Sequence, residues 1–118
     1  KHLERAGVEV LTLRGRSEHG RVPLVDVLKE LGKREILSVL LEAGSALNGA
    51  ALAAGIVQKV SLFLAPKLAG GCEVPVARAP ELAVPQLTDI RTRQFGPDLC
   101  IEGYLQDVYG NHRARRHN

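Results

Sequence analysis

The feature that most constrains the fold is an almost unbroken apolar run at residues 36–41, in which Ser38 is the one polar residue. Charged residues precede this run, and Glu42, Ala43 and Gly44 follow it. Apolar runs of this length are typical of a strand that is covered on both faces, as in the parallel sheets of α/β proteins. The run therefore predicts an internal strand of an α/β fold.

The segments around this run predict alternating strands and helices. Strands are expected at residues 8–13, 36–41 and 59–65, and helices at residues 1–6, 22–31 and 46–54. Each helix is followed by a glycine, where a left-handed end is least costly: Gly7, Gly32 and Gly55. Pro23 is tolerated in a first helical turn, and Ser45 is expected to cap its helix. This order predicts parallel βαβ units.

The C-terminal part of the chain predicts a different arrangement. Three prolines, at positions 75, 80 and 85, make residues 70–85 irregular. Residues 87–95 and 99–105 alternate around Gly96-Pro97-Asp98, which indicates an antiparallel hairpin. The predicted fold class is therefore α/β, a mixed sheet with parallel units first and an antiparallel hairpin last. Residues 1–110 are expected to form the domain portion, and residues 111–118 a basic, flexible tail.

Composition narrows the range of functions. With 118 residues, 45% of them hydrophobic and only 3% aromatic, the chain is expected to be one domain with an aliphatic core that offers little base stacking. The net charge of +3 lies largely in the tail, so no nucleic-acid partner is expected. Cys72 and Cys100 are far apart, and no apolar stretch is long enough to cross a bilayer. We expect a cytoplasmic protein without a membrane contact or a metal site, since the four histidines show no ligand spacing.

The strongest candidate site follows the apolar run, at Glu42-Ala43-Gly44-Ser45. Ligands of open α/β sheets bind beyond the carboxyl ends of strands, where helix N-termini offer free amides to phosphates. Glu42 could accept hydrogen bonds from a substrate there, while Gly44 allows a close approach. The same residues are also compatible with a solvated glutamate and an ordinary strand-to-helix turn. A nucleoside-triphosphate loop is disfavoured, because Ala50 stands where that motif requires lysine.

Three stretches of the chain resemble the reductase domain of the bifunctional riboflavin-biosynthesis deaminase-reductases. They are residues 36–47 (ILSVLLEAGSAL), 55–57 (GIV) and 64–71 (LAPKLAGG). The family pattern is an apolar strand, Glu-Gly-Gly, a helix, a strand and then Pro-Lys-x-x-Gly-Gly. Further matches, from residues 7–10 to 98–99, extend the resemblance over nearly the whole chain.

The resemblance implies a dihydrofolate-reductase-like fold, a dimer, and NADPH as the cofactor. The implied reaction is reduction of 5-amino-6-(5-phosphoribosylamino)uracil, a pyrimidine ribosyl phosphate, to its ribitylamino product. The family's substrate-binding glutamate corresponds to Glu42, while no catalytic residue is identified. The implied cofactor-binding residues are Gly44, Ser45, Ala46, Leu47, Asn48, Gly49 and Ala50.

Two departures from the family pattern bear on these expectations. Ala43 replaces the usual glycine, and a left-handed conformation there would cost roughly 1–2 kcal/mol. The earlier half of the family's reductase domain has no counterpart in these residues, so we expect an incomplete domain. Two alternatives stay open: a non-catalytic α/β nucleotide-binding or assembly module, and a nucleic-acid-binding domain that depends on residues 111–118.

Overall fold

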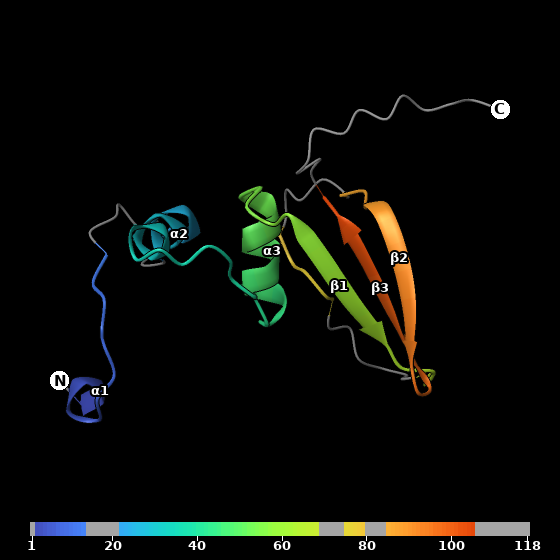
Figure 1. Ribbon diagram of the computed structural model, residues 1–118, viewed down its shortest axis with the longest axis horizontal. Coiled ribbons are helices and arrows are strands. Elements are labelled where there is room, and N and C mark those ends of the chain that lie inside the picture. Colours follow the sequence, from blue (N-terminus) through green and yellow to red (C-terminus); the bar gives the residue numbers. More distant parts are fainter. Residues whose placement is uncertain (1, 14–21, 69–74, 80–84, 106–118) are drawn as a thin grey trace. The chain divides into compact units, whose positions relative to one another are not determined.

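The computed structural model describes residues 2–13, 22–68, 75–79 and 85–105 (Figure 1). The chain divides into two units, residues 1–42 and 43–118, and each is described by itself. The boundary lies between Glu42 and Ala43, within the segment that the sequence identifies as the candidate site. The predicted tail at residues 111–118 lies outside the described residues, as do Cys72 and Pro80.

The first unit contains two helices, α1 (His2–Arg5) and α2 (Leu24–Lys33). Helix α1 ends as predicted, because Gly7 has a left-handed φ of 78° and its amide donates to the carbonyl of Glu4. Helix α2 follows Pro23, but its predicted stop at Gly32 is wrong. The helix continues through this glycine, which costs only about 1 kcal/mol in a helix interior.

The left-handed residue that ends α2 is Glu35, with φ at 62°. Its amide donates to the carbonyl of Gly32, and the amide of Ile36 donates to the carbonyl of Leu31. These two bonds form a Schellman motif, in which glycine is the usual left-handed residue. The left-handed residue that follows α2 therefore lies three residues beyond the glycine that the sequence suggested, and it carries a side chain.

The strands predicted at residues 8–13 and 36–41 are not formed, and neither are the parallel units that depended on them. A strand needs a hydrogen-bonded neighbour, and the described part of the first unit supplies none. Both segments are largely exposed, and Leu37 and Leu40 keep 97% and 83% of their surface accessible. The segment at residues 8–13 is connected to the end of α2 by Arg34, which donates two hydrogen bonds of 2.7 Å to the carboxylate of Glu9.

The second unit begins with helix α3 (Ser45–Ala53), one residue earlier than predicted at each end. Gly44, and not Ser45, is the N-cap residue, and it is extended with φ −76° and ψ 170°. Ser45 therefore lies inside the first turn and forms no capping hydrogen bond. The C-terminal end is as predicted, because Gly55 is left-handed with φ at 65°.

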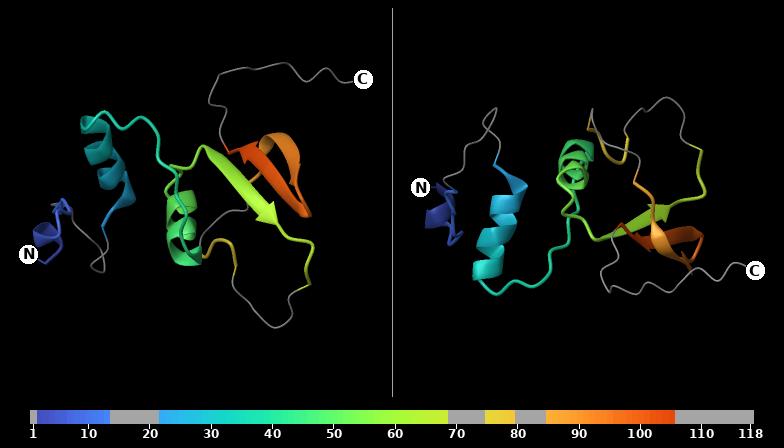
Figure 2. Two further views of the ribbon diagram at one scale, coloured as in Figure 1. Left: turned by 60° about the horizontal axis from the view of Figure 1, so that its bottom comes forward. Right: turned by 90° about the horizontal axis from the view of Figure 1, so that it is seen from above.

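Strands β1 (Lys59–Leu64), β2 (Thr88–Phe95) and β3 (Asp98–Tyr104) form an antiparallel sheet in the order β1-β3-β2 (Figures 1 and 2). The predicted hairpin is confirmed, with Phe95 paired to Asp98 across a two-residue loop. Gly96 has φ at 58°, the sign that a type II′ loop requires at its first position. Strand β1 was also predicted correctly, but its neighbour β3 runs antiparallel to it.

A β-bulge interrupts the pairing of β2 with β3. The register shifts between Thr88 and Arg91, and Asp89 there is left-handed with φ at 49°. The bulge lies beside Gly103, where a Cβ would come within 2.9 Å of the Cβ of Leu87. The glycine at position 103 therefore allows the chain at Leu87 and Thr88 to approach β3 closely.

Few apolar side chains are buried in the described part of the chain. Ala51 of α3 and Cys100 of β3 keep only 1% and 2% of their surface accessible. On one face of the sheet, Phe63 and Phe95 come together with ring centroids 5.9 Å apart, and Phe63 is still 67% exposed. Within the described residues, no helix has the length and apolar character needed to cross a membrane.

Candidate functional site

Residues Glu42, Ala43 and Gly44 immediately precede α3, and Gly44 is extended. The side chain of Glu42 is exposed, and Ala43 is half-buried. Glu35 and Asp89 are the non-glycine residues with positive φ in the described chain, so Ala43 does not adopt the left-handed conformation. Ala43, which replaces the usual glycine of the family pattern, therefore does not carry the cost of a left-handed backbone.

The N-terminus of α3 leaves amides without intrahelical acceptors. The carbonyl of Gly44 accepts hydrogen bonds from the amides of Leu47 and Asn48, both at 3.1 Å. The amides of Ser45 and Ala46 precede the first possible intrahelical bond, and the helix dipole adds partial positive charge there. The first turn has no acidic residue, and a Cβ built on Gly44 meets nothing within 4 Å among the described atoms. The turn is therefore open to an anion.

The seven predicted cofactor-binding residues differ in exposure. Gly49 is buried and Ser45 and Asn48 are half-buried, so these three face neighbouring parts of the protein. Ala46, Leu47 and Ala50 are exposed, as is Gly44 before the helix. A ligand at this helix therefore has direct access to the N-terminal turn and to one exposed side of α3.

The segment at residues 75–79 covers the less exposed side of α3. The amide of Arg78 donates to the carbonyl of Ser45 at 2.8 Å. A Cβ at Gly49 would overlap the backbone of Arg78, so Gly49 permits a contact within the protein. Asn48 donates to the carbonyl of Val76 at 2.9 Å and to the carbonyl of Ala43 at 3.0 Å. Sequence reasoning missed this role for residues 75–79, whose prolines indicated irregular structure.

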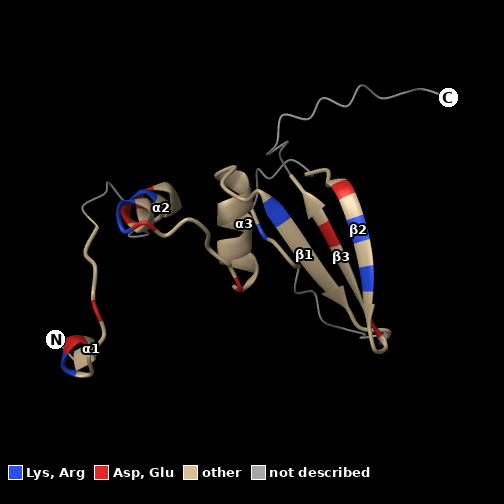
Figure 3. Cartoon of the chain, in the orientation of Figure 1, with Lys and Arg blue, Asp and Glu red and all other residues tan. Residues whose placement is uncertain are grey.

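A second polar cluster lies on the sheet around Glu102. Its carboxylate accepts from Lys59 at 2.9 Å, from Ser61 at 3.1 Å and from Arg93 at 2.5 Å. Figure 3 shows the acidic position on β3 between basic positions on β1 and β2. These partners lower the pKa of Glu102 to about 2, with the bonds to Lys59 and Arg93 as the largest causes. Lys59 and Arg93 are both already paired with the carboxylate of Glu102, so we assign this cluster to the stability of the sheet.

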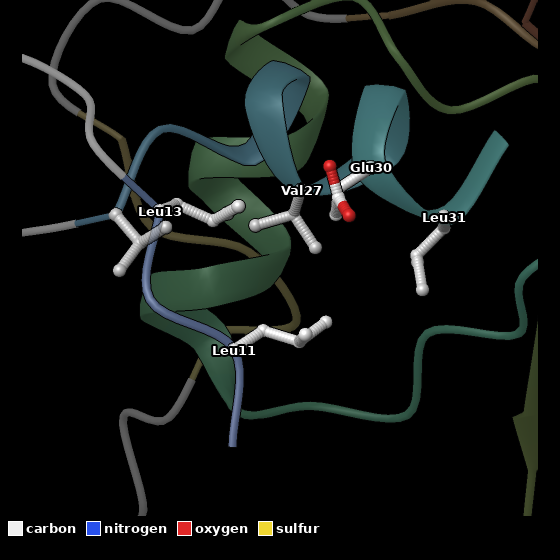
Figure 4. A pocket seen from close by; sticks show the side chains of 6 residues that line it. Leu11, Leu13, Val27, Glu30 and Leu31 are labelled. Atoms are coloured by element: carbon white, nitrogen blue, oxygen red, sulfur yellow. The ribbon is translucent and has the colours of Figure 1, made fainter. Parts of the chain in front are cut away.

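The first unit holds an apolar hollow of about 280 Å³ (Figure 4). It is lined by residues of the 8–13 segment, of α2 and of the turn before it: Leu11, Leu13, Val22, Val27, Glu30 and Leu31. Glu30 accepts a 3.1 Å hydrogen bond from Lys33, which holds the pKa of its carboxyl below the ordinary value. The hollow is suited to an apolar group, and it was not predicted from the sequence. In the part of the chain that the structure describes, no group of acids, histidines and cysteines could hold a metal ion.

Comparison with known proteins identifies the family. The family model described as the RibD C-terminal domain matches residues 1–101. The chain belongs to the RibD C-terminal domain family. The matched residues include Glu42, the whole of α3, strands β1 and β2, and the first four residues of β3.

Individual relatives agree with this family. The chain is 42% identical, over 88% of its length, to the riboflavin biosynthesis protein RibD of Synechocystis sp.. It is 38% identical, over 81% of its length, to RibD of Actinobacillus pleuropneumoniae, and 38% identical, over 71% of its length, to RibD of Escherichia coli. These matches cover 28%, 26% and 24% of the three relatives, so the chain spans about a quarter of their length.

Proposed function

We propose that this chain is part of a reductase domain that uses NADPH to reduce 5-amino-6-(5-phosphoribosylamino)uracil in riboflavin biosynthesis. The observation that carries the proposal is the family match over residues 1–101, which includes Glu42 and the first turn of α3. The relatives are named as riboflavin biosynthesis proteins, which supports the pathway. The reductase chemistry itself is inferred from the family resemblance.

The amides of the α3 first turn are suited to hold the pyrophosphate of NADPH. Among the described atoms nothing lies within 4 Å of a Cβ built on Gly44, and the first turn has no acidic residue. The amides of Ser45 and Ala46 lie outside the intrahelical pattern. In this proposal the exposed residues Ala46, Leu47 and Ala50 lie along the cofactor, while Asn48 and Gly49 support the helix from the protein side. NADPH, when bound, supplies the hydride, and the chain orients the two reactants.

Glu42 is the proposed substrate-binding residue. Its carboxylate is exposed and lies two positions before the N-cap of α3. An ionised carboxylate accepts charge-assisted hydrogen bonds, which suits the N–H and O–H groups of a ribosylamino pyrimidine. Glu42 therefore selects and orients the substrate without entering the hydride transfer.

The exposed apolar surface of the first unit supports the proposal that more polypeptide completes the domain. Fully burying a leucine or valine stabilises a fold by about 1.5–3 kcal/mol relative to leaving it in water. Leu37, Val39 and Leu40 each keep at least half of their surface accessible in the described chain. We propose that the rest of the reductase domain, or a second subunit of a homodimer, covers these residues in a cytoplasmic enzyme.

Titration with NADPH, followed by cofactor fluorescence, tests the proposal. The chain is titrated alone and together with the remaining part of the reductase domain, and substrate reduction is followed by loss of NADPH absorbance. Saturable binding and reduction in the completed domain are the expected result. No saturable binding by the completed domain would exclude the proposal. Binding without reduction would favour the alternative of a non-catalytic nucleotide-binding module.

A further inference from the structure

The side-chain amide of Asn48 connects two backbone segments that are distant in sequence. Its Nδ2 atom donates to the carbonyl of Ala43, five residues earlier, at 3.0 Å. The same atom donates to the carbonyl of Val76, 28 residues later, at 2.9 Å. An asparagine amide has two N–H groups, so both donors are engaged by the protein itself.

Both acceptors belong to segments that shape the proposed cofactor turn. Ala43 immediately precedes Gly44, whose carbonyl accepts the first helical bonds of α3. Val76 belongs to the segment at residues 75–79, in which the amide of Arg78 donates to the carbonyl of Ser45 at 2.8 Å. Asn48 therefore connects the residue before Gly44 to the segment at residues 75–79. The same segment also contacts the first residue of α3 through Arg78.

We propose that Asn48 is a positioning residue for the cofactor turn, and that it acts through the backbone of Ala43 without donating to the cofactor. The inference rests on the proposed function, because it assigns the Gly44 turn to NADPH. Without the amide of Asn48, the carbonyl of Ala43 loses its side-chain partner and the turn gains conformational freedom. Ordering the turn then opposes cofactor binding, since preorganisation lowers the entropic cost of association.

The inference predicts a specific kinetic pattern. Asn48→Ala should raise the KM and Kd for NADPH roughly tenfold, the effect expected for losing one or two neutral hydrogen bonds. The kcat at saturating NADPH should stay within about twofold, because Asn48 contacts no reacting atom in this arrangement. Asn48→Asp should weaken NADPH binding more than Asn48→Ala, because it places carboxylate oxygens against two carbonyl oxygens.

The matched control is Gln94→Ala. Gln94 also donates from a side-chain amide to a backbone carbonyl, that of Gly96 in the hairpin, at 3.1 Å. Its loss removes a comparable hydrogen bond away from α3, so the Kd for NADPH should remain at the wild-type value. Thermal unfolding of both variants separates lost stability from lost cofactor affinity.

The experiment uses the completed reductase domain and measures the Kd, KM and kcat for wild type and variants. If the wild type does not bind NADPH, the proposed function fails and this inference falls with it. If the wild type binds and Asn48→Ala keeps its Kd, or loses kcat at an unchanged KM, only the inference is overturned. Should Asn48→Ala fail to fold, Asn48→Leu removes both N–H donors and keeps the approximate size of the side chain. An increased KM at an unchanged kcat then supports the inference, and a wild-type KM overturns it.

Discussion

Gly49 of α3 lies against the backbone of Arg78, with no space between them for a side chain. The contact lies one helical turn after Ser45, whose carbonyl accepts the amide of Arg78. The glycine thus allows residues 75–79 to run along the first two turns of the helix. Since the same helix holds the proposed cofactor turn, the contact connects the packing of the chain with its proposed function.

Gly49→Ala is expected to lower the free energy of unfolding by up to about 2 kcal/mol. The added methyl group overlaps backbone atoms that cannot rotate away, and overpacking of this kind costs about 1–3 kcal/mol. Alanine's higher helix propensity offsets about 1 kcal/mol of this cost. The matched control is Gly32→Ala in α2, where no described atom lies within 4 Å of the added Cβ and stability should rise by about 0.5–1 kcal/mol. Equal effects in urea denaturation would contradict the contact.

The helix ends offer a second pair of substitutions. Glu35 and Gly55 occupy the same left-handed position after α2 and α3, with φ at 62° and 65°. Glu35→Gly should raise the free energy of unfolding by about 0.5–1 kcal/mol, because glycine relieves the Cβ strain at some cost in chain entropy. Gly55→Ala should lower it by about 1 kcal/mol for the converse reason. Thermal unfolding checks both, and a loss of stability in Glu35→Gly would refute the strain at that residue.

Several elements that the sequence predicted correctly have local signals. Gly7 and Gly55 end their helices, and the Gly96-Pro97 loop joins β2 to β3. Each depends on the conformational preference of one or two residues, which does not change with tertiary context. The strands at residues 8–13 and 36–41 were predicted from apolar character alone. An apolar run indicates that its side chains are to be buried. Which neighbouring element buries them depends on the rest of the fold.

In the candidate site, too, some features follow from local sequence and others depend on residues far apart in the chain. The glycine turn and the helix after Glu42 followed from local patterns, and the structure places them together. The contacts of Asn48 with Val76 and of Gly49 with Arg78 join positions about 30 residues apart. Periodicity within one segment carries no information about such pairs. The cluster of Glu102 with Lys59 and Arg93 was missed for a related reason, because it depends on the register of three strands.

The stability of the chain should depend on acidic pH through Glu102. Its pKa falls from 4.5 to about 2 in the folded protein. A folded pKa below the unfolded value means that the stabilisation is complete above about pH 4.5 and is lost as the pH falls toward 2. Glu102→Gln should therefore reduce the difference between unfolding midpoints measured at pH 6 and pH 3. Arg93→Gln should reduce it in part, and an unchanged difference in Glu102→Gln would exclude this cluster as its source.

Glu42→Gln separates the proposed roles of the carboxylate and the helix turn. Glutamine keeps the size of the side chain and removes its charge, so the charge-assisted hydrogen bonds to substrate are lost. Losing one such bond should lower kcat/KM for the pyrimidine substrate by about tenfold to a hundredfold.

The Kd for NADPH should change less than twofold in the same variant, because the proposed contacts of the cofactor are backbone amides that the substitution leaves in place. Glu35→Gln, which removes an exposed carboxylate at the end of α2, is the control and should leave both constants unchanged. Steady-state kinetics and NADPH titration of the completed domain measure the two effects. Equal losses of substrate use and NADPH binding in Glu42→Gln would show that one residue serves both ligands, and that the proposed separation between the carboxylate and the α3 turn is wrong.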